Sequence, residues 1–102
     1  NVRIINPFAP GGTSDIIIRP VAERLERILG RTFVIENRAG GGGAAGAGAA
    51  AQERPDGYTF LVSTPAPLAL LPLLVPNLPY NPDTAFSYVS LLGGAPIVCA
   101  VK

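Results

Sequence analysis

The chain has 102 residues, of which 48% are hydrophobic and 15% charged, so it can bury a core and is too apolar to be disordered. Its net charge of +1 comes without a run of basic residues, which argues against nucleic acid as a partner. The absence of histidine and the single cysteine exclude histidine-based catalysis, an internal disulfide and a multi-thiolate metal site. We expect no cofactor and no catalytic residue. Cys99, flanked by apolar residues, is expected to be a buried small hydrophobe.

The first predicted strand covers residues 2–6 and runs into a turn rich in proline and glycine. A helix over residues 14–29 should follow, with Thr13 or Ser14 as N-cap and Asp15 in its first turn. This arrangement aims free backbone N–H groups and the positive end of a helix dipole at one spot, which favours an anion. The alternative is a plain strand-to-helix turn in which the glycines only relieve backbone strain.

Helical spacing predicts one buried apolar face on this helix, formed by Ile17, Val21, Leu25 and Ile28. The opposite face should carry two ion pairs four residues apart, Arg19–Glu23 and Glu23–Arg27. Gly30 should end the helix, and Pro20 inside it should kink the axis.

A second strand is predicted at 32–36, a flexible loop at 40–43, a small-residue helix at 44–53 and a third strand at 58–63. This β-α-β-α-β order indicates an α/β fold with a parallel sheet. Six prolines between residues 65 and 82 allow only short helical turns there.

Two more strands are predicted at 87–92 and 97–101. Because the last of them is still strongly apolar, we expect the chain to be part of a larger fold. Unpaired strands would then let it associate with itself. No signal peptide and no membrane span is visible in the sequence.

The glycines Gly41, Gly43 and Gly46 have the spacing of a dinucleotide-binding fingerprint, but they begin several residues after the strand instead of directly behind it. Close helix–sheet packing beside a mobile loop explains them better. The first loop lacks the lysine of an NTP-binding loop.

Two hydroxyl residues, Ser63 and Thr64, should lie at the same sheet edge as the first loop. They would suit a carboxylate, or they cap the end of the strand. Asp15 either caps its own helix, which we favour, or accepts a hydrogen bond from a ligand.

Taken together, the motifs in residues 2–15, 34–40, 55–59, 78–82 and 87–92 resemble the solute receptors of tripartite tricarboxylate transporters, the Bug-type periplasmic binding proteins. The resemblance covers essentially the whole chain. Asn6 and Pro20 stand where apolar residues are usual in that family. The resemblance implies a two-lobed fold like that of type II periplasmic binding proteins. Residues 1–102 would form part of lobe one, without the second lobe.

The resemblance also implies a function: capture of a small carboxylate in the periplasm and its delivery to the subunits of a membrane transporter. A first group of ligand contacts carries over onto the first loop, at Phe8, Ala9, Gly11, Gly12, Thr13, Ser14 and Asp15. A second group carries over onto Ser63, Thr64 and Ala66. Two other functions stay open: an α/β enzyme fragment, and a shortened lobe that binds nothing.

Overall fold

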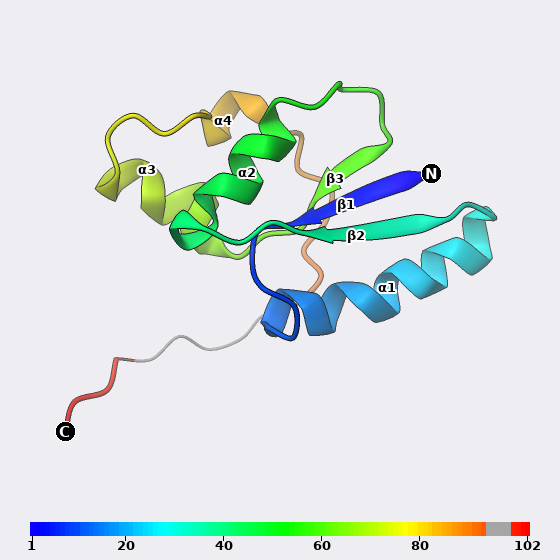
Figure 1. The fold of residues 1–102 in the computed structure, drawn as a ribbon, viewed down its shortest axis with the longest axis horizontal. Helices are drawn as coiled ribbons and strands as arrows, with labels where there is room; N and C mark the ends of the chain where they lie inside the picture. The colour runs from blue at the N-terminus through cyan, green and yellow to red at the C-terminus, as the bar shows by residue number, and fades with distance from the viewer. Residues whose placement is uncertain (94–98) are drawn as a thin grey trace.

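The computed structural model describes residues 1–93 and 99–102. Its centre is a sheet of three parallel strands, β1 (Val2–Asn6), β2 (Phe33–Asn37) and β3 (Thr59–Leu61), in the order β2-β1-β3. Helix α1 (Thr13–Leu29) covers one face of the sheet and helix α2 (Ala44–Ala51) lies over the other (Figure 1). The predicted β-α-β-α-β order and parallel sheet are confirmed.

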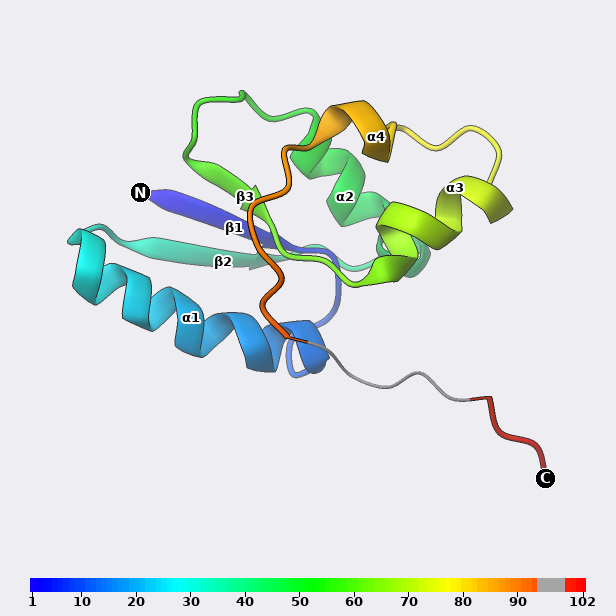
Figure 2. The same cartoon turned by 180° about the vertical axis from the view of Figure 1, so that it is seen from behind.

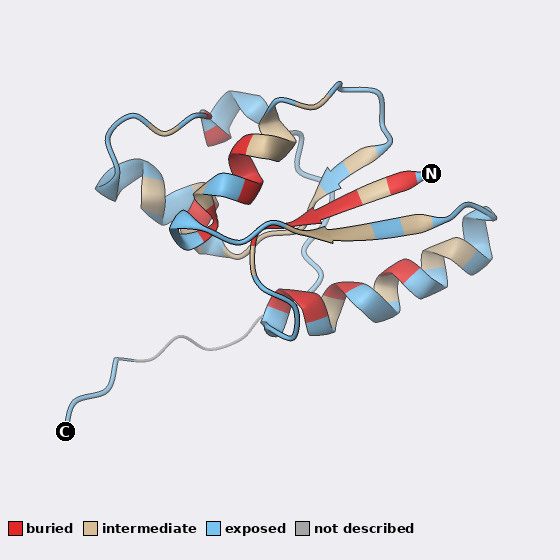
Figure 3. Ribbon diagram, in the orientation of Figure 1, coloured by how far each residue is buried: buried red, intermediate tan, exposed pale blue. Residues whose placement is uncertain are grey.

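Strand β1 lies in the middle of the sheet and contributes three of the seven buried hydrophobic residues among the described ones (Figure 3). Ile4 packs with Ile18 and Ala22 of α1, and the partly buried Phe33 and Ile35 of β2 pack against this cluster. Ile5, which alternates to the opposite face of the sheet, is completely buried. The alternating residues of β1 therefore contribute buried apolar side chains to both faces of the sheet.

The face that α1 turns to the sheet differs from the prediction. The buried residues are Ser14, Asp15, Ile18 and Ala22, whereas Ile17, Val21 and Leu25 are half-buried and Ile28 is 65% exposed. Helix α1 has 17 residues and β1 has five, so the helix measures about 25 Å against about 17 Å for the strand. The end of the helix consequently extends past the sheet, and the apolar residues of its last turn, Ile28 and Leu29, are exposed.

The ends of α1 also differ in part from the prediction. Gly12 is the N-cap, not Thr13 or Ser14. Gly30 ends the helix as predicted, with a left-handed φ of 66° and its N–H donating to the carbonyl of Glu26. Arg19 pairs with Asp15 rather than with Glu23. The helix continues through Pro20.

Helix α2 packs closely on its neighbours, as its small residues predict. A Cβ atom on Gly46 would lie 2.5 Å from the Cα of Pro7 and 2.9 Å from the carbonyl oxygen of Arg38. The helix is two residues shorter than expected and follows a 3₁₀ turn, η1 (Gly41–Gly43), in which every glycine has a positive φ. Gly46 thus serves close packing, as we favoured over a nucleotide fingerprint.

An ionic cluster joins the two strands to the residues after α2. The Arg3 guanidinium donates to both carboxylate oxygens of Glu36, at 2.9 and 3.0 Å, and lies 3.0 Å from the carboxylate of Glu53. Arg3 lowers the pKa of Glu36. Because these side chains are about one-third exposed, we expect the cluster to fix orientation more than to add stability.

The proline-rich connection forms only short helical turns, as predicted: η2 (Ala66–Leu70), α3 (Leu71–Leu74) and α4 (Pro82–Ala85). The hydroxyl of Tyr80, a buried residue, donates to the carbonyl of Pro67 and ties the two ends of this connection together. None of the helices among the described residues is long and apolar enough to cross a membrane.

The prediction of a strand at 87–92 is wrong. This stretch is irregular, and it runs from α4 toward the start of α1, where Gly93 lies near Ile17 (Figure 2). A strand needs a neighbour for its backbone hydrogen bonds, and no described strand pairs with these residues. Cys99 is exposed instead of buried. The strand predicted at 97–101 lies partly outside the described residues.

Candidate functional site

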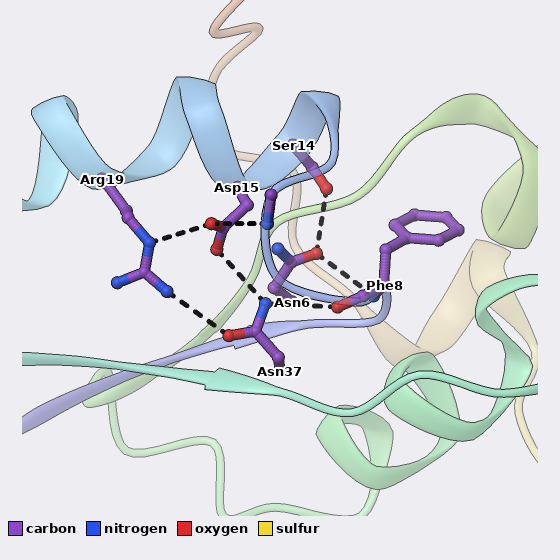
Figure 4. Close-up of polar contacts among 7 residues, drawn as sticks. Asn6, Phe8, Ser14, Asp15, Arg19 and Asn37 are labelled. Atoms are coloured by element: carbon purple, nitrogen blue, oxygen red, sulfur yellow. Dashed lines mark hydrogen bonds and ion pairs between the residues drawn. The ribbon is translucent and has the colours of Figure 1, made fainter.

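The loop between β1 and α1 starts at the carboxyl end of the central strand. Asn6, the last residue of that strand, has a completely buried side chain. The Asn6 Oδ1 atom accepts two hydrogen bonds, one from the Phe8 N–H at 3.2 Å and one from the Ser14 hydroxyl at 2.9 Å (Figure 4). This side chain therefore links the beginning of the loop to the first turn of α1.

A second asparagine supports the same loop from the neighbouring strand. Asn37 is the register partner of Asn6 in the parallel pair of β1 and β2, so both side chains lie on the α1 face. Its Nδ2 donates to the carbonyl of Phe8 and to Asp15 Oδ1, both at 3.2 Å (Figure 4). The loop is held from two strands at once.

Both carboxylate oxygens of Asp15 are engaged inside the protein. Oδ2 accepts from the Gly11 N–H at 3.1 Å and from Arg19 Nε at 2.9 Å, and Oδ1 accepts from Asn37. These partners, the Arg19 guanidinium first and the Gly11 N–H next, lower the pKa of Asp15 from 3.8 to about 2. The cap on its own helix that we favoured for Asp15 does not form among the described residues, because its oxygens accept from the loop, from Arg19 and from Asn37 instead. This geometry favours a role in shaping the loop, and any contact of Asp15 with a ligand stays a prediction.

The N-terminus of α1 is open. The N-cap Gly12 has no side chain, and among the described residues no side chain accepts a hydrogen bond from a backbone N–H of the first turn. The glycines beside it are sparsely surrounded: a Cβ atom on Gly11 would meet nothing within 4 Å, and one on Gly12 would meet only the Ala9 carbonyl, at 3.6 Å. Backbone N–H groups of the first helical turn are therefore left for another partner.

The segment after β3 lies at the same sheet edge. Its backbone leaves the strand beside β1, where the Val62 N–H donates to the carbonyl of Ile5 at 3.0 Å. Ser63, Thr64 and Ala66 are half-buried, and the Ser63 hydroxyl donates to the carbonyl of Thr64. The two loops approach each other at Gly43, since a Cβ atom there would collide with Pro67 and lie 3.2 Å from the Phe8 ring.

The structure thus brings the two predicted groups of residues to one edge of the sheet. Phe8 is half-buried and its ring packs at Gly43, while Ala9, Gly11, Gly12 and Thr13 are exposed and Ser14 and Asp15 are buried. The sequence analysis did not identify Asn6, Arg19 and Asn37 as the residues whose side chains hold the loop and Asp15 in place. A polar residue at the end of each of two adjacent strands was the available signal. Within the described part of the chain, no group of three or more metal-ligating side chains occurs.

This fold is similar to part of the fold of a solved periplasmic binding protein. The chain belongs to the family described as the tripartite tricarboxylate transporter family receptor, whose model matches residues 17–102. It is 42% identical to Protein BugT of Bordetella pertussis over 98 residues, which is 95% of this chain and 30% of BugT. The resemblance seen in the sequence is confirmed.

Solved structures agree with this assignment. MatC of Rhodopseudomonas palustris, solved with bound malate, has a TM-score of 0.84 at 36% identity, over 90% of this chain and 31% of MatC. The Rpa4515 protein of R. palustris with adipate has a TM-score of 0.79 at 39% identity, over 82% of this chain and 28% of that one. BugD, a periplasmic binding protein, matches at 43% identity with a TM-score of 0.56, over 59% of this chain and 20% of BugD. The chain spans about a third of the length of these proteins.

The lowered pKa of Asp15 predicts a specific loss of stability in acid. Ionised Asp15 stabilises the folded chain fully above pH 3.8, and this contribution should disappear as the pH falls through about 2. Denaturant unfolding of the parent and of Asp15→Asn, followed between pH 5 and pH 2, measures it. We expect the parent's advantage over Asp15→Asn to shrink toward the acid end. A constant difference would contradict the contacts described for Asp15. The pKa of Glu36 is also lowered, but Glu36 is present in both proteins, so its contribution to the pH dependence of stability cancels in this comparison.

Proposed function

We propose that this chain forms part of a receptor for small carboxylates, with the β1–α1 loop and the segment after β3 as one wall of the binding site. The ligand contacts would come from Phe8, Ala9, Gly11, Gly12, Thr13, Ser14, Asp15, Ser63, Thr64 and Ala66, largely through backbone groups and water. No catalytic step is part of this proposal, and family membership supports a receptor rather than an enzyme.

The observation that carries the proposal is the open N-terminus of α1 at the carboxyl edge of the sheet. Its free N–H groups and the dipole of a 17-residue helix favour an anion. Gly11 has a φ of 89°, a conformation that side-chain-bearing residues rarely adopt, so the chain keeps this turn bare. A carboxylate can consequently approach the backbone directly.

Asp15 is compatible with an anionic ligand in this arrangement. Its side chain is 6% exposed and is paired with the Arg19 guanidinium at 2.9 Å. The pair is close to neutral as a unit, so its repulsion of a bound carboxylate is small. Water between the loop and the ligand would reduce the repulsion further.

The similar proteins support the ligand class. Malate and adipate, bound in the two R. palustris structures, both carry two carboxylates. We therefore propose a mono- or dicarboxylate as ligand. By the same family relationship we propose a periplasmic location and transfer of the ligand to a membrane transporter.

A titration monitored by amide NMR tests the proposal. Succinate, malate and adipate should shift the amide signals of Gly11, Gly12 and Thr13, with an affinity on the order of millimolar because one wall buries little of a small ligand. Succinamide, which has the same length without the charges, is the matched control and should leave these signals unchanged. Shifts confined to other residues, or equal shifts with succinamide, would refute the placement.

We also propose that the chain associates with itself. Large apolar side chains on α3 and after α4 are exposed, among them Leu73 at 82% and Leu91 at 90%. Such surfaces bind other chains. Light scattering over a range of protein concentrations should show a mass that rises above 10.5 kDa. A constant monomer mass would contradict this prediction.

A further inference from the structure

Asn6 is an unusual end for a buried strand. The residues before it in β1 include Val2, Ile4 and Ile5, all buried, and its own side chain has no exposed surface. A buried amide lowers stability unless its polar atoms find partners. An apolar residue would continue the pattern of the strand without this cost. The presence of an amide side chain at this position therefore needs an explanation.

The oxygen of Asn6 does a defined task. It accepts from the Phe8 N–H at 3.2 Å and from the Ser14 hydroxyl at 2.9 Å. Phe8 begins the loop and Ser14 lies in the first turn of α1. One atom thus fixes how far apart the two ends of the loop lie, and with them the direction of the N–H groups at Gly12 and Thr13.

The side-chain nitrogen of Asn6 donates no hydrogen bond to the described part of the protein. Nδ2 is the one buried side-chain nitrogen or oxygen among the described residues that lacks a hydrogen-bond partner. Leaving a buried donor unpaired destabilises a fold. The unpaired nitrogen of Asn6 therefore lowers stability, whereas its oxygen holds the loop in place. This combination is typical of a residue that serves a functional site rather than stability.

We propose that Asn6 is a positioning residue of the carboxylate site: it holds the Phe8–Ser14 loop in the geometry in which the N–H groups of the α1 terminus converge on the ligand. This inference rests on the proposed function. Asn37 holds the same loop through the Phe8 carbonyl and Asp15, so the loop should keep its general course when Asn6 is replaced, and lose only its fine placement.

Asn6→Leu tests the inference, because leucine suits the apolar strand and has a similar size. We expect succinate to bind about tenfold more weakly, as when a supporting partner behind a binding residue is removed. The matched control is Ile4→Val, which weakens the core of the same strand without touching the loop, and it should bind as the parent does. Ser14→Ala removes one of the two bonds and should give a smaller loss. It also serves if Asn6→Leu does not fold. All affinities are measured at a temperature where circular dichroism shows each variant folded.

The amide NMR spectrum, without ligand, separates failure of this inference from failure of the proposed function. In Asn6→Leu the signals of Gly11, Gly12 and Thr13 should shift or broaden and their hydrogen exchange should speed up, whereas Ile4→Val leaves them in place. If the parent binds and Asn6→Leu binds equally well, the inference is wrong. If the parent binds no carboxylate, the proposed function fails, and unchanged loop signals in Asn6→Leu would then refute the positioning role by themselves.

Discussion

Replacing Gly46 with alanine is expected to lower the free energy of unfolding by about 2 kcal/mol. The added methyl group would lie 2.5 Å from the Cα of Pro7 and 2.9 Å from the Arg38 carbonyl, and both are backbone atoms that cannot turn aside. Overpacking of this kind costs up to about 3 kcal/mol, and alanine recovers only about 1 kcal/mol in helix propensity. For a chain of this size the melting temperature should fall by roughly 4–8 °C per kcal/mol.

Gly48→Ala is the matched comparison for Gly46→Ala. Both glycines are buried in α2, but the new methyl at Gly48 would meet the ring of Pro79, at 2.9 Å from Cγ, which belongs to the irregular connection and can shift. We expect the gain in helix propensity to offset the contact, so its stability should stay within about 0.5 kcal/mol of the parent. Thermal melts followed by circular dichroism measure both variants. Equal effects of the two substitutions would mean that α2 does not rest on Pro7.

Replacing Gly12 with valine is expected to abolish carboxylate binding while leaving the fold intact. Gly12 has φ −75° and ψ 178°, an extended conformation that valine readily adopts, and its Cβ has only one ordinary contact. A side chain at the N-cap lies over the N–H groups of the second and third helical residues. The methyl groups of valine would therefore cover the N–H groups of Ser14 and Asp15, which belong to the open first turn of α1 where we place the anion.

Gly12→Ser separates blocking from loss of structure. Serine at the N-cap would itself accept a hydrogen bond from the first turn, which should raise stability by a few tenths of a kcal/mol while competing with the ligand. We expect succinate titrations to show weaker binding for both variants, and denaturant unfolding to show a loss of no more than about 1 kcal/mol for Gly12→Val and none for Gly12→Ser. Undiminished binding by Gly12→Val would place the carboxylate elsewhere.

Much of the fold follows from local pattern. The apolar run of β1, the Gly30 stop after α1, the small residues of α2 and the prolines after β3 each act through the backbone next to them. These elements are where the sequence predicts them, within two or three residues. The edge at which the two loops meet also follows, because parallel strands carry their carboxyl ends on one side.

Three of the errors share one cause. Ile28 is exposed, residues 87–92 form no strand and Cys99 is exposed, because burial and strand pairing depend on which neighbours are present and not on the residue's own character. A periodic apolar pattern indicates what could be buried, but only a packed partner buries it.

The site divides in the same way. The sequence by itself determined the glycine turn, the helix behind it and the family, since these depend on conformational preferences and on motifs of adjacent residues. Only the tertiary structure decided that Asn6 and Asn37 are register partners and that their side chains bond the backbone N–H and the backbone carbonyl of Phe8. It also decided that the Asp15 carboxylate accepts from Gly11, Arg19 and Asn37. The hydrogen bonds of Asn37 with Asp15 and Phe8 join residues that are 22 and 29 positions apart in the chain. Such bonds depend on strand register, which is set when the sheet forms around its core.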